Sequence, residues 1–222
     1  MFSQDVNKTK ENIYDNIVGL ENSGLFNGKR YYNAYKTTPN NTNFYIFTDF
    51  SKANAVFDEQ PYYNVDLKYD VTTDQLITKL NNNLSYINIQ LVKNKVSSFN
   101  IDNHHFINSK LLLNDSIPDL GFLEIVYTTP LYKFLIKRIK RVSKELENKK
   151  YVFTFRSYDV YYFFFEDKLY EISSYKDLRK IMPDLKKDIN DFYRNNKKLL
   201  KSDEELFVVN LLKQLEYKNR NK

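Results

Sequence analysis

Residues 151–172, YVFTFRSYDVYYFFFEDKLYEI, constrain the fold of this chain more than any other stretch. Aromatic and β-branched side chains pack well when strand neighbours flank them, so two strands are predicted here, joined by a short turn at Glu166-Asp167-Lys168. Residues 161–165 are all aromatic and therefore occupy both faces of a strand. One face is expected to lie on a core, and the other is a candidate contact surface.

Short segments with strand character precede this stretch. In residues 65–70 the apolar residues fall on odd positions and the charged or polar ones on even positions, which is the period of a strand with one buried face. No helix of crossover length separates the segments, so antiparallel hairpins are predicted. The expected strands cover 29–36, 44–48, 54–57, 62–69, 71–80, 86–92, 95–101, 105–110 and 122–128, with a loop over 111–120.

Residues 131–146 allow two interpretations. As a helix, the apolar residues from Leu131 to Leu146 share one face and the basic residues share another, so periodicity favours a helix. As a strand, Leu131, Leu135 and Ile139 share their face with lysines, which is a poorer pattern.

The same region holds the charge of the chain. Residues 131–150 contain eight basic and two acidic residues, a net of +6 that equals the formal charge of the whole chain. A local basic stripe indicates an anionic partner, although a solvated face of a helix or strand has the same composition.

Composition narrows the chemistry. Cysteine is absent, which excludes a disulfide framework, a thiolate zinc site and a cysteine nucleophile. With only 4 glycines and 5 prolines, no glycine-rich phosphate loop is present, and turns are predicted to rely on Asn and Asp. No apolar run approaches the roughly 20 residues of a membrane helix. No cofactor and no transmembrane segment are predicted.

The C-terminal part is predicted to be helical. Ser174 with Asp177, and Ser202 with Glu205, have the spacing of a capping box. The expected helices cover 175–182, 184–195 and 203–217, and Pro183 separates the first from the second. Their apolar stripes are expected to pack on the sheet. The predicted fold is therefore α+β and β-dominated: an N-terminal lead-in (1–25), an antiparallel meander forming a half-open barrel or sandwich (26–172), and a helical cap (173–222).

Catalytic and metal-binding patterns are weak. His104 and His105 would point to opposite faces of a strand, whereas Asp102 and His104 would share a face and could pair. Asp66, Asp70 and Asp74 form a spaced acidic series, but the turn glycine and terminal glutamate of a calcium loop are missing. No serine elbow, HExxH motif or P-loop occurs. No catalytic residue and no metal site are predicted.

Several motifs resemble exported proteins of the Bacteroidota that have no named function. They are Asn27-Gly28-Lys29-Arg30-Tyr31, residues 64–70 and 96–101, Tyr161-Tyr162-Phe163, residues 169–172 and residues 174–183. The resemblance covers most of the chain and implies an extended strand for the basic segment, against its periodicity. It supplies no activity and no catalytic residues.

Two short motifs bear on localisation. Phe2-Ser3-Gln4 resembles the end of secretory signal peptides in such envelope proteins, which implies a periplasmic or secreted protein whose signal peptide has been removed. Asp115-Ser116-Ile117 resembles their short O-glycosylation acceptor, with Ser116 as the candidate site.

The predicted function is that of a non-enzymatic cell-envelope accessory or binding protein, which engages another protein or an anionic envelope partner. A nucleic-acid-binding protein that uses residues 131–150 is the main alternative, since basic and aromatic residues interleave there. A hydrolase with carboxylates in a concave sheet face is a further alternative. The candidate partner surface consists of Lys133, Lys137, Arg138, Lys140, Arg141, Tyr158, Tyr162 and Phe164.

Overall fold

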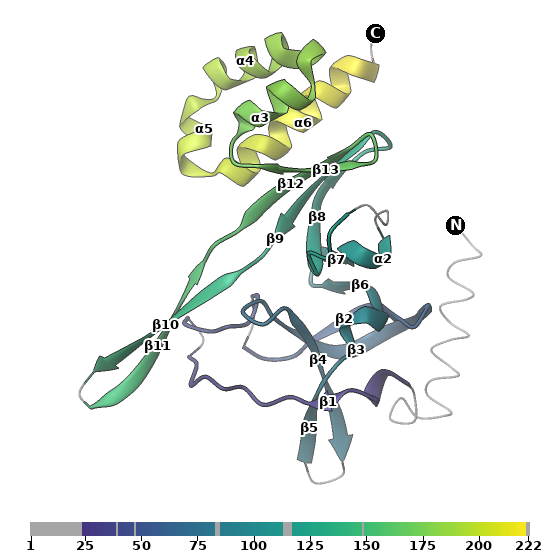
Figure 1. Ribbon diagram of the computed structural model, residues 1–222, viewed down its shortest axis with the longest axis vertical. Coiled ribbons are helices and arrows are strands. Elements are labelled where there is room, and N and C mark those ends of the chain that lie inside the picture. Colours follow the sequence, from purple (N-terminus) through teal and green to yellow (C-terminus); the bar gives the residue numbers. More distant parts are fainter. Residues whose placement is uncertain are drawn as a thin grey trace. The chain divides into compact units, whose positions relative to one another are not determined.

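The computed structural model describes residues 24–220 except 39, 47, 83–84, 113–116 and 148. It is β-dominated, with a large antiparallel sheet of 11 strands and a C-terminal helical segment (Figure 1). The strand order is β1-β5-β4-β3-β2-β6-β7-β8-β9-β12-β13, so the sheet is open, and β10 and β11 form a separate two-stranded sheet. The predicted α+β class with an antiparallel meander is confirmed.

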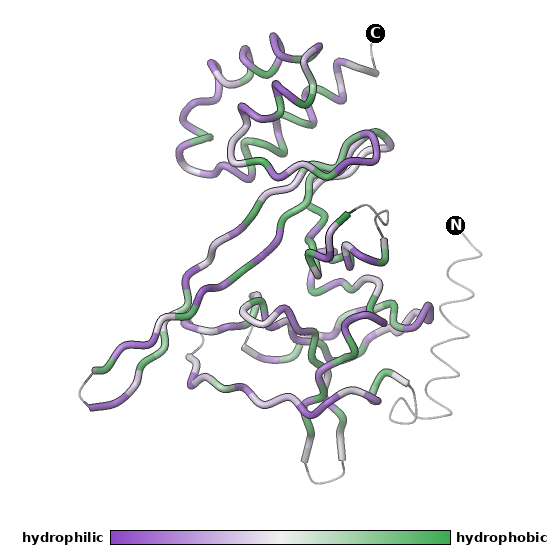
Figure 2. The backbone as a smooth tube through the Cα atoms, in the orientation of Figure 1, coloured by the Kyte–Doolittle hydropathy of each residue, from purple (hydrophilic) through white to green (hydrophobic). Residues whose placement is uncertain are grey.

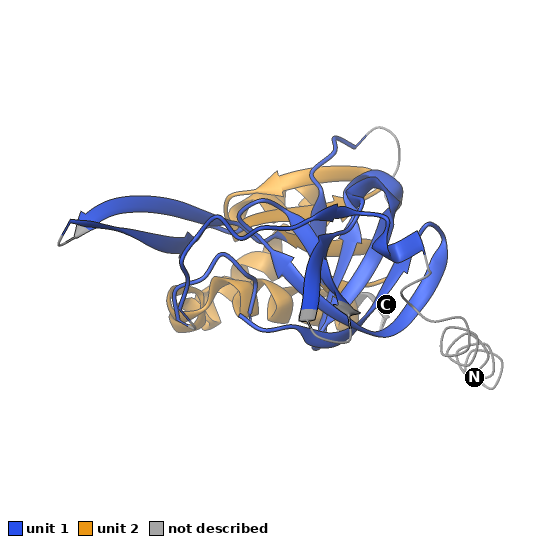
Figure 3. Cartoon of the chain, turned by 90° about the horizontal axis from the view of Figure 1, so that it is seen from below, with its two compact units in different colours: residues 1–125, 137–159 blue, residues 126–136, 160–222 orange. Residues whose placement is uncertain are grey.

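The chain forms two compact units (Figure 3). Unit 1 contains residues 1–125 and 137–159, and unit 2 contains residues 126–136 and 160–222. The boundaries between them fall within β8 (Phe122–Thr128), within β9 (Tyr132–Lys137) and between Asp159 and Val160. The helical residues 173–222 thus share a unit with β12 and β13. None of the described helices is both long and apolar enough to span a membrane.

Unit 1 contains most of the predicted hairpins. Its first seven strands are β1 (Lys29–Arg30), β2 (Ser51–Phe57), β3 (Gln60–Asp70), β4 (Gln75–Asn82), β5 (Ser85–Gln90), β6 (Val96–Ile101) and β7 (His104–Asn108). Short helices are η2 (Gly24–Phe26), η3 (Lys93–Lys95) and α2 (Ser109–Leu112). The pairs from β2 to β5, and from β2 through β6 and β7 to β8, are all antiparallel.

Several predictions for unit 1 are wrong in part: the segment 105–110 ends as a strand at Asn108, and the predicted loop 111–120 begins within α2 (Ser109–Leu112). The segment 29–36 is a strand only at its first two residues, and 44–48 contributes only an isolated bridge between Phe44 and Asp70. The segment 71–80 starts as a strand at Gln75, because Asp70 Oδ1 accepts hydrogen bonds from the backbone amides of Thr72 and Thr73. An aspartate that bonds the backbone in this way holds a turn and stops the strand.

Eight described residues other than glycine have positive φ: Asp58, Glu59, Asn64, Asp74, Asp102, Lys149, Glu166 and Asp167. The four aspartates lie in turns, as predicted, whereas Asn64 lies within β3. Gly121 also has φ +71°, and a Cβ there would lie 1.8 Å from Asp74 Oδ2, so only glycine fits beside this carboxylate.

The core of unit 1 is built around aromatic rings. The ring of Tyr69 lies 5.3 Å from Phe99, 5.2 Å from Phe106 and 5.9 Å from Phe122, and all four residues are buried. Most of these contacts are edge-to-face, the geometry that the ring quadrupole favours. Ala53, Ala55, Val65 and Leu67 complete the inner face of the sheet around them.

Residues 151–172 form three strands, so the prediction of two is wrong. β11 (Lys150–Ser157) ends before Tyr158 and Asp159, and β12 (Val160–Phe165) and β13 (Lys168–Ile172) then form the expected hairpin. The break is stabilised by tertiary contacts, since Asp159 accepts a hydrogen bond from Arg138. The predicted turn is confirmed, with positive φ at Glu166 and Asp167.

The basic segment is extended: it forms β9 and β10 (Lys140–Glu147), so the helix favoured by periodicity is wrong. Phe134, Leu135 and Ile136 are fully buried at consecutive positions. A strand covered on both faces has such a continuous apolar run, and this run also satisfies a helical spacing.

Unit 2 holds the C-terminal helices α3 (Tyr175–Ile181), η4 (Pro183–Leu185), α4 (Lys186–Asn195), α5 (Lys197–Ser202) and α6 (Glu204–Arg220). The capping box of Ser174 and Asp177 is confirmed. The predicted box at Ser202 is wrong, because Asp203 Oδ1 accepts from the Leu206 amide at 2.8 Å while Ser202 bonds back to Leu199. The helix α5 was not predicted.

These helices cover the strands of their own unit. Phe163 and Ile172 of the β12–β13 hairpin share a buried cluster with Leu178, Ile189 and Phe207 of the helices. Tyr132 of β9 donates a hydrogen bond to the Leu212 carbonyl at 3.0 Å. The apolar stripes of the helices therefore lie on strands, as expected.

Candidate interaction surface

The most distinctive feature of unit 1 is the ribbon of β10 and β11, residues 140–157, which we call the arm. It extends away from the rest of its unit (Figure 3). Among the described residues its strands pair only with each other, in a register that runs from Lys140 opposite Ser157 to Glu147 opposite Lys150. A two-stranded ribbon of this kind is marginally stable in water by itself.

The register divides the side chains of the arm between two faces, because directly opposite residues of antiparallel strands share a face. The apolar face pairs Val142 with Phe155, Lys144 with Phe153, and Leu146 with Tyr151. The polar face pairs Arg141 with Arg156, Ser143 with Thr154, and Glu145 with Val152. Hydrophobic positions continue to the far end of the arm (Figure 2).

The inner part of the apolar face is covered by the segment before β2. The ring of Tyr35 meets Phe153 at 5.3 Å and Phe155 at 5.2 Å, both edge-to-face. The side chain of Asn41 donates to the Phe153 carbonyl at 2.5 Å and accepts from the Phe155 amide at 3.0 Å. Asn41 therefore pairs with the outer edge of β11 as a neighbouring strand would.

The outer part of the apolar face is exposed to solvent. Leu146 is 66% exposed, Tyr151 63% and Val142 37%. The ammonium of Lys144 lies 3.6 Å from the centre of the Tyr151 ring, a cation–π contact. Clustered exposed apolar side chains framed by cations are typical of surfaces that bind a partner.

Buried ion pairs hold the base of the arm. Arg138, just before β10, donates to Glu124 of β8 at 2.6 Å and to Asp159, just after β11, at 2.8 Å. The side chains of Arg138 and Glu124 are only 12% and 5% exposed. Because Arg138 and Asp159 flank the two strands, their ion pair closes the ribbon where it leaves the unit.

Glu124 has two further partners. The hydroxyl of Tyr45 donates to it at 2.9 Å, and His104 Nδ1 lies 2.5 Å from its other oxygen. Burial works to raise the pKa of Glu124, but the hydrogen bonds and the charge of Arg138, with the bonds from His104 and Tyr45, outweigh it and lower that pKa. Glu124 is thus held as a carboxylate.

Asp74 is the centre of a second cluster in unit 1. Lys137 lies 2.7 Å from Asp74, Tyr69 donates to it at 2.6 Å, and Lys93 bonds its other oxygen. Burial works to raise the pKa of Asp74, and the charge and hydrogen bond of Lys137, with the bonds from Lys93 and Tyr69, outweigh it, so the pKa is lowered. Lys137 is engaged inside the unit and only 13% exposed.

The eight residues of the predicted partner surface have different environments. In unit 1, Lys140 donates to the carbonyls of Phe44 and Tyr45, and the guanidinium of Arg141 lies 3.7 Å from the centre of the Tyr158 ring. Tyr158 is 48% exposed. Lys137 and Arg138 are occupied by the ion pairs described above.

The remaining three residues belong to unit 2. Lys133 lies 4.9 Å from the centre of the Phe164 ring, and Tyr162 is partly buried, which raises its pKa. The structure thus brings together two cation–aromatic pairs, Arg141 with Tyr158 and Lys133 with Phe164. The eight residues as one partner surface stay a prediction.

Sequence reasoning missed the exposed residues of the arm. Val142, Lys144 and Leu146 alternate along β10, and Tyr151 lies opposite Leu146. The signal was present as a two-residue alternation in residues 140–147, but it is recognisable only if the segment is interpreted as a strand.

The histidines do not behave as a pair with Asp102. His104 contacts Glu124 and Tyr45, whereas Asp102 lies in the turn between β6 and β7 with φ 55°. The suggested pairing of Asp102 with His104 is therefore wrong, because the turn takes Asp102 off the regular alternation of the strand. His105 bonds Asn100, and burial lowers its pKa.

The spaced aspartates have protein partners. Asp66 lies 3.2 Å from Lys52 and 3.4 Å from Lys79, and Asp70 accepts from the Tyr31 hydroxyl at 2.9 Å. Within the part of the chain that the structure describes, no three or more histidine or carboxylate side chains gather as metal ligands would.

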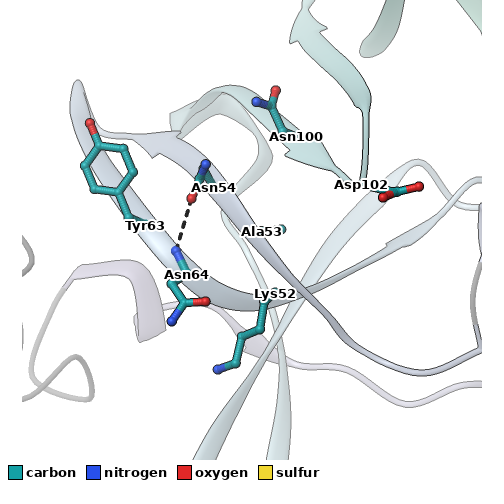
Figure 4. Close-up of a pocket in the computed structure, with 7 residues that line it drawn as sticks. All are labelled: Lys52, Ala53, Asn54, Tyr63, Asn64, Asn100 and Asp102. Atoms are coloured by element: carbon teal, nitrogen blue, oxygen red, sulfur yellow. Dashed lines mark hydrogen bonds between the residues drawn. The ribbon is translucent and has the colours of Figure 1, made fainter. Parts of the chain in front are cut away.

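Two open depressions lie elsewhere. One, of about 310 Å³, is on unit 1 and is lined by Lys52, Ala53, Asn54, Tyr63, Asn64, Asn100 and Asp102 (Figure 4). The Asn64 amide donates to Asn54 Oδ1 at 3.1 Å, so part of its polar lining is already paired. The other, of about 1030 Å³, is in unit 2 between the β12–β13 turn and the α3–η4 corner.

Comparison with family models, with curated proteins and with solved structures finds no match for this chain. The likeness to exported proteins of the Bacteroidota therefore stays a prediction. Ser116 and Phe2-Ser3-Gln4, on which the glycosylation and export predictions depend, lie outside the described residues.

Proposed function

We propose that this protein is a non-enzymatic accessory or binding protein of the cell envelope, and that it holds another protein on the outer part of the arm. The observation that carries the proposal is the exposure of Leu146, Tyr151 and Val142 on one face of a ribbon that leaves the rest of unit 1. Full burial of one large apolar side chain contributes about 1.5–3 kcal/mol, so a partner that covers these residues gains free energy of binding from each of them.

The charge of the arm supports an acidic partner. Residues 140–157 contain six basic and two acidic residues, a net of +4. Complementary charge raises the rate of association and selects among partners more than it raises affinity. An acidic protein surface with apolar side chains at its centre fits both properties of the arm.

The base of the arm supports a role in binding rather than a passive loop. The contacts of Arg138 with Glu124 and Asp159 are short and largely buried, and Asn41 and Tyr35 support β11. A binding surface on a supported element loses less conformational entropy when a partner arrives.

A nucleic-acid partner is the second candidate, favoured by the same charge of +4 and by Tyr151 and Tyr158. However, Lys144 and Arg141 already cover one face of each of these rings. Single-strand binding uses free aromatic faces on which bases stack, and the exposed Leu146 and Val142 offer none, so the apolar face favours a protein partner. Titration of a fluorescent single-stranded RNA at several salt concentrations distinguishes the two, since phosphate contacts give a steep salt dependence.

The buried carboxylates Glu124 and Asp74 do not suit the role of a general acid in the hydrolase alternative. Glu124 and Asp74 each contact a cation, and both have lowered pKa values. A general acid in a hydrolase instead needs a raised pKa.

Location in the envelope is the part of the proposal that depends on resemblance. Fractionation of the native cells, with protease added to intact and permeabilised cells, tests it. Recovery of the protein with cytoplasmic markers contradicts an exported protein.

Photo-crosslinking tests the arm as the binding surface. A photoreactive amino acid replaces Tyr151, and the matched control replaces Tyr86 of β5, which is 60% exposed in the same unit. We expect a discrete protein adduct in native envelopes from position 151 only, and we expect Leu146→Ser to abolish it. Equal adducts from both positions, or adducts that survive Leu146→Ser, contradict the proposal.

A further inference from the structure

The two edges of the arm differ in whether their outward backbone groups are hydrogen-bonded. The carbonyl of Phe153 and the amide of Phe155 point to Asn41 and therefore away from β10. Backbone groups of alternate residues in a strand point to opposite sides, so Phe153 and Phe155 bond outward and Thr154 bonds inward. Thr154 pairs with Ser143 of β10.

The same alternation applies to β10. Ser143 bonds inward, so Val142, Lys144 and Leu146 direct their amides and carbonyls away from β11. The bond from the Tyr158 amide to the Ile139 carbonyl, at 2.9 Å, agrees with this assignment. Among the described residues, no side chain forms hydrogen bonds with the outward backbone groups of β10, as Asn41 does with those of β11. One edge of the arm is capped and the other is open.

We propose that the open edge of β10 pairs antiparallel with β10 of a second copy of this chain, so that two arms join into a four-stranded sheet. A twofold axis relates the two copies, as in most homodimers. Three or more strands with an apolar face are stable where a two-stranded ribbon is marginal, so pairing stabilises both arms.

The charges of β10 select one register. With Ser143 at the twofold axis, Arg141 lies opposite Glu145 of the second copy, and this contact occurs twice. Val142 lies opposite Lys144 of the second copy, and outward-bonding residues meet outward-bonding residues, as a hydrogen-bonded ladder requires.

The neighbouring registers bring like charges together. With Lys144 at the axis, Lys144 lies opposite Lys144 of the second copy, and with Glu145 at the axis, Glu145 lies opposite Glu145 of the second copy. With Val142 at the axis, Lys140 lies opposite Lys144 of the second copy. Like charges directly opposite each other destabilise a sheet, and opposite charges stabilise it. Among these four registers, only the one centred on Ser143 pairs opposite charges without a like-charge contact.

Lysine on an edge strand also has another explanation, which is protection of a bare edge against pairing. The two explanations differ at Arg141 and Glu145, because protection requires no complementarity between these residues. The dimer goes beyond the proposed function and does not depend on it, since pairing at the edge leaves the apolar face of each arm available.

Charge exchange is the first test, with the full chain and sedimentation velocity over a range of concentrations. Arg141→Glu and Glu145→Arg are each expected to weaken self-association about tenfold or more, because each replaces two attractive contacts with repulsive ones. An equimolar mixture of the two variants is expected to form a heterodimer, since opposite charges then meet at both contacts. A wild type that stays monomeric to about millimolar concentration, or a mixture that fails to associate, overturns the proposal.

A cysteine scan tests the register directly, because the chain has no cysteine. Residues of a non-hydrogen-bonded pair have Cα atoms about 4.5 Å apart, within the range that a disulfide requires. Under oxidised glutathione, Ser143→Cys is expected to form a covalent dimer, and Glu145→Cys is expected to do so at least about tenfold more slowly, because about four residues of strand then separate the thiols. Equal rates overturn the register.

A backbone test completes the experiment. Lys144→Pro removes an outward amide and Lys144→Ala keeps it, and proline is tolerated on an edge strand where its nitrogen faces outward. Circular dichroism of each variant checks that the fold is retained. Self-association is expected to be lost in Lys144→Pro and retained in Lys144→Ala. Equal association of the two variants overturns strand pairing.

Discussion

The chain contains two consecutive hairpins rich in aromatic residues, β10–β11 and β12–β13, with opposite environments. In β12 the side chain of Phe163 is fully buried under the helices of unit 2. In the arm, Leu146 and Tyr151 are more than half exposed, and Tyr35 and Asn41 contact β11 only in its inner part. Composition alone thus does not decide whether an aromatic hairpin is a core element. An aromatic hairpin becomes a core element only where other elements of the fold cover it.

The largest effect that separates the two hairpins is expected from truncation of a ring. Phe163→Ala is expected to destabilise the protein by about 3–5 kcal/mol, since it leaves a cavity in a packed core. Tyr151→Ala is the matched change in the arm and is expected to stay within about 0.5 kcal/mol. Urea unfolding of both variants measures the difference. Equal losses of stability contradict the comparison.

A slightly smaller effect is expected at the base of the arm. Arg138→Met leaves the buried carboxylate of Glu124 without its cation, which is expected to cost about 3 kcal/mol. The double variant with Glu124→Gln is expected to recover part of this loss, because it removes the unpaired charge. A double-mutant cycle by urea unfolding checks it, and strictly additive losses show that the pair is not coupled.

Acid is expected to destabilise unit 1 through the same carboxylates. The folded-state pKa values of Glu124 and Asp74 are lowered, so their stabilisation is complete above the unfolded pKa of about 4 and is lost as pH falls through the folded values. Each pKa unit of lowering corresponds to about 1.4 kcal/mol. The urea midpoint between pH 6 and pH 2.5 is the measurement, and Glu124→Gln is expected to flatten its slope.

The smallest effect is expected at the edge of β11 that Asn41 caps. Asn41→Ala removes two hydrogen bonds to β11, each contributing about 0.5–1.5 kcal/mol. Hydrogen exchange of the arm amides is expected to accelerate, while the amides of β12 and β13 keep their protection. Uniform acceleration in both hairpins shows that Asn41 acts on the whole protein instead.

Local signals of the sequence were sufficient for much of the fold. The alternation in residues 65–70 marks the middle of β3, and the capping box at Ser174 marks the start of α3. These elements depend on interactions within a few residues, so the sequence carries them directly. The misassigned cap at Ser202 shows the limit, because Asp203 satisfies the same helix end equally well.

The candidate site was less accessible to sequence reasoning. Glu124, His104 and Arg138 come from distant parts of the chain, and only the pairing of β7 with β8 and the position of Arg138 before β10 bring them together. In the helical interpretation of residues 131–146, Val142 and Leu146 belong to the apolar face. Their exposure depends on what lies over β10, and no local pattern reports that.

The β-dominated class, the turns held by aspartates and the helical C-terminal part can all be predicted from the residues, because backbone preferences and side-chain periodicity are local properties. Three-dimensional contacts were needed to show that the basic segment is extended against its periodicity, that Arg138 is buried against Glu124, and that one aromatic hairpin is covered while the other is exposed. Burial and ion pairing are set by contacts between residues far apart in the chain, and a sequence pattern does not contain them.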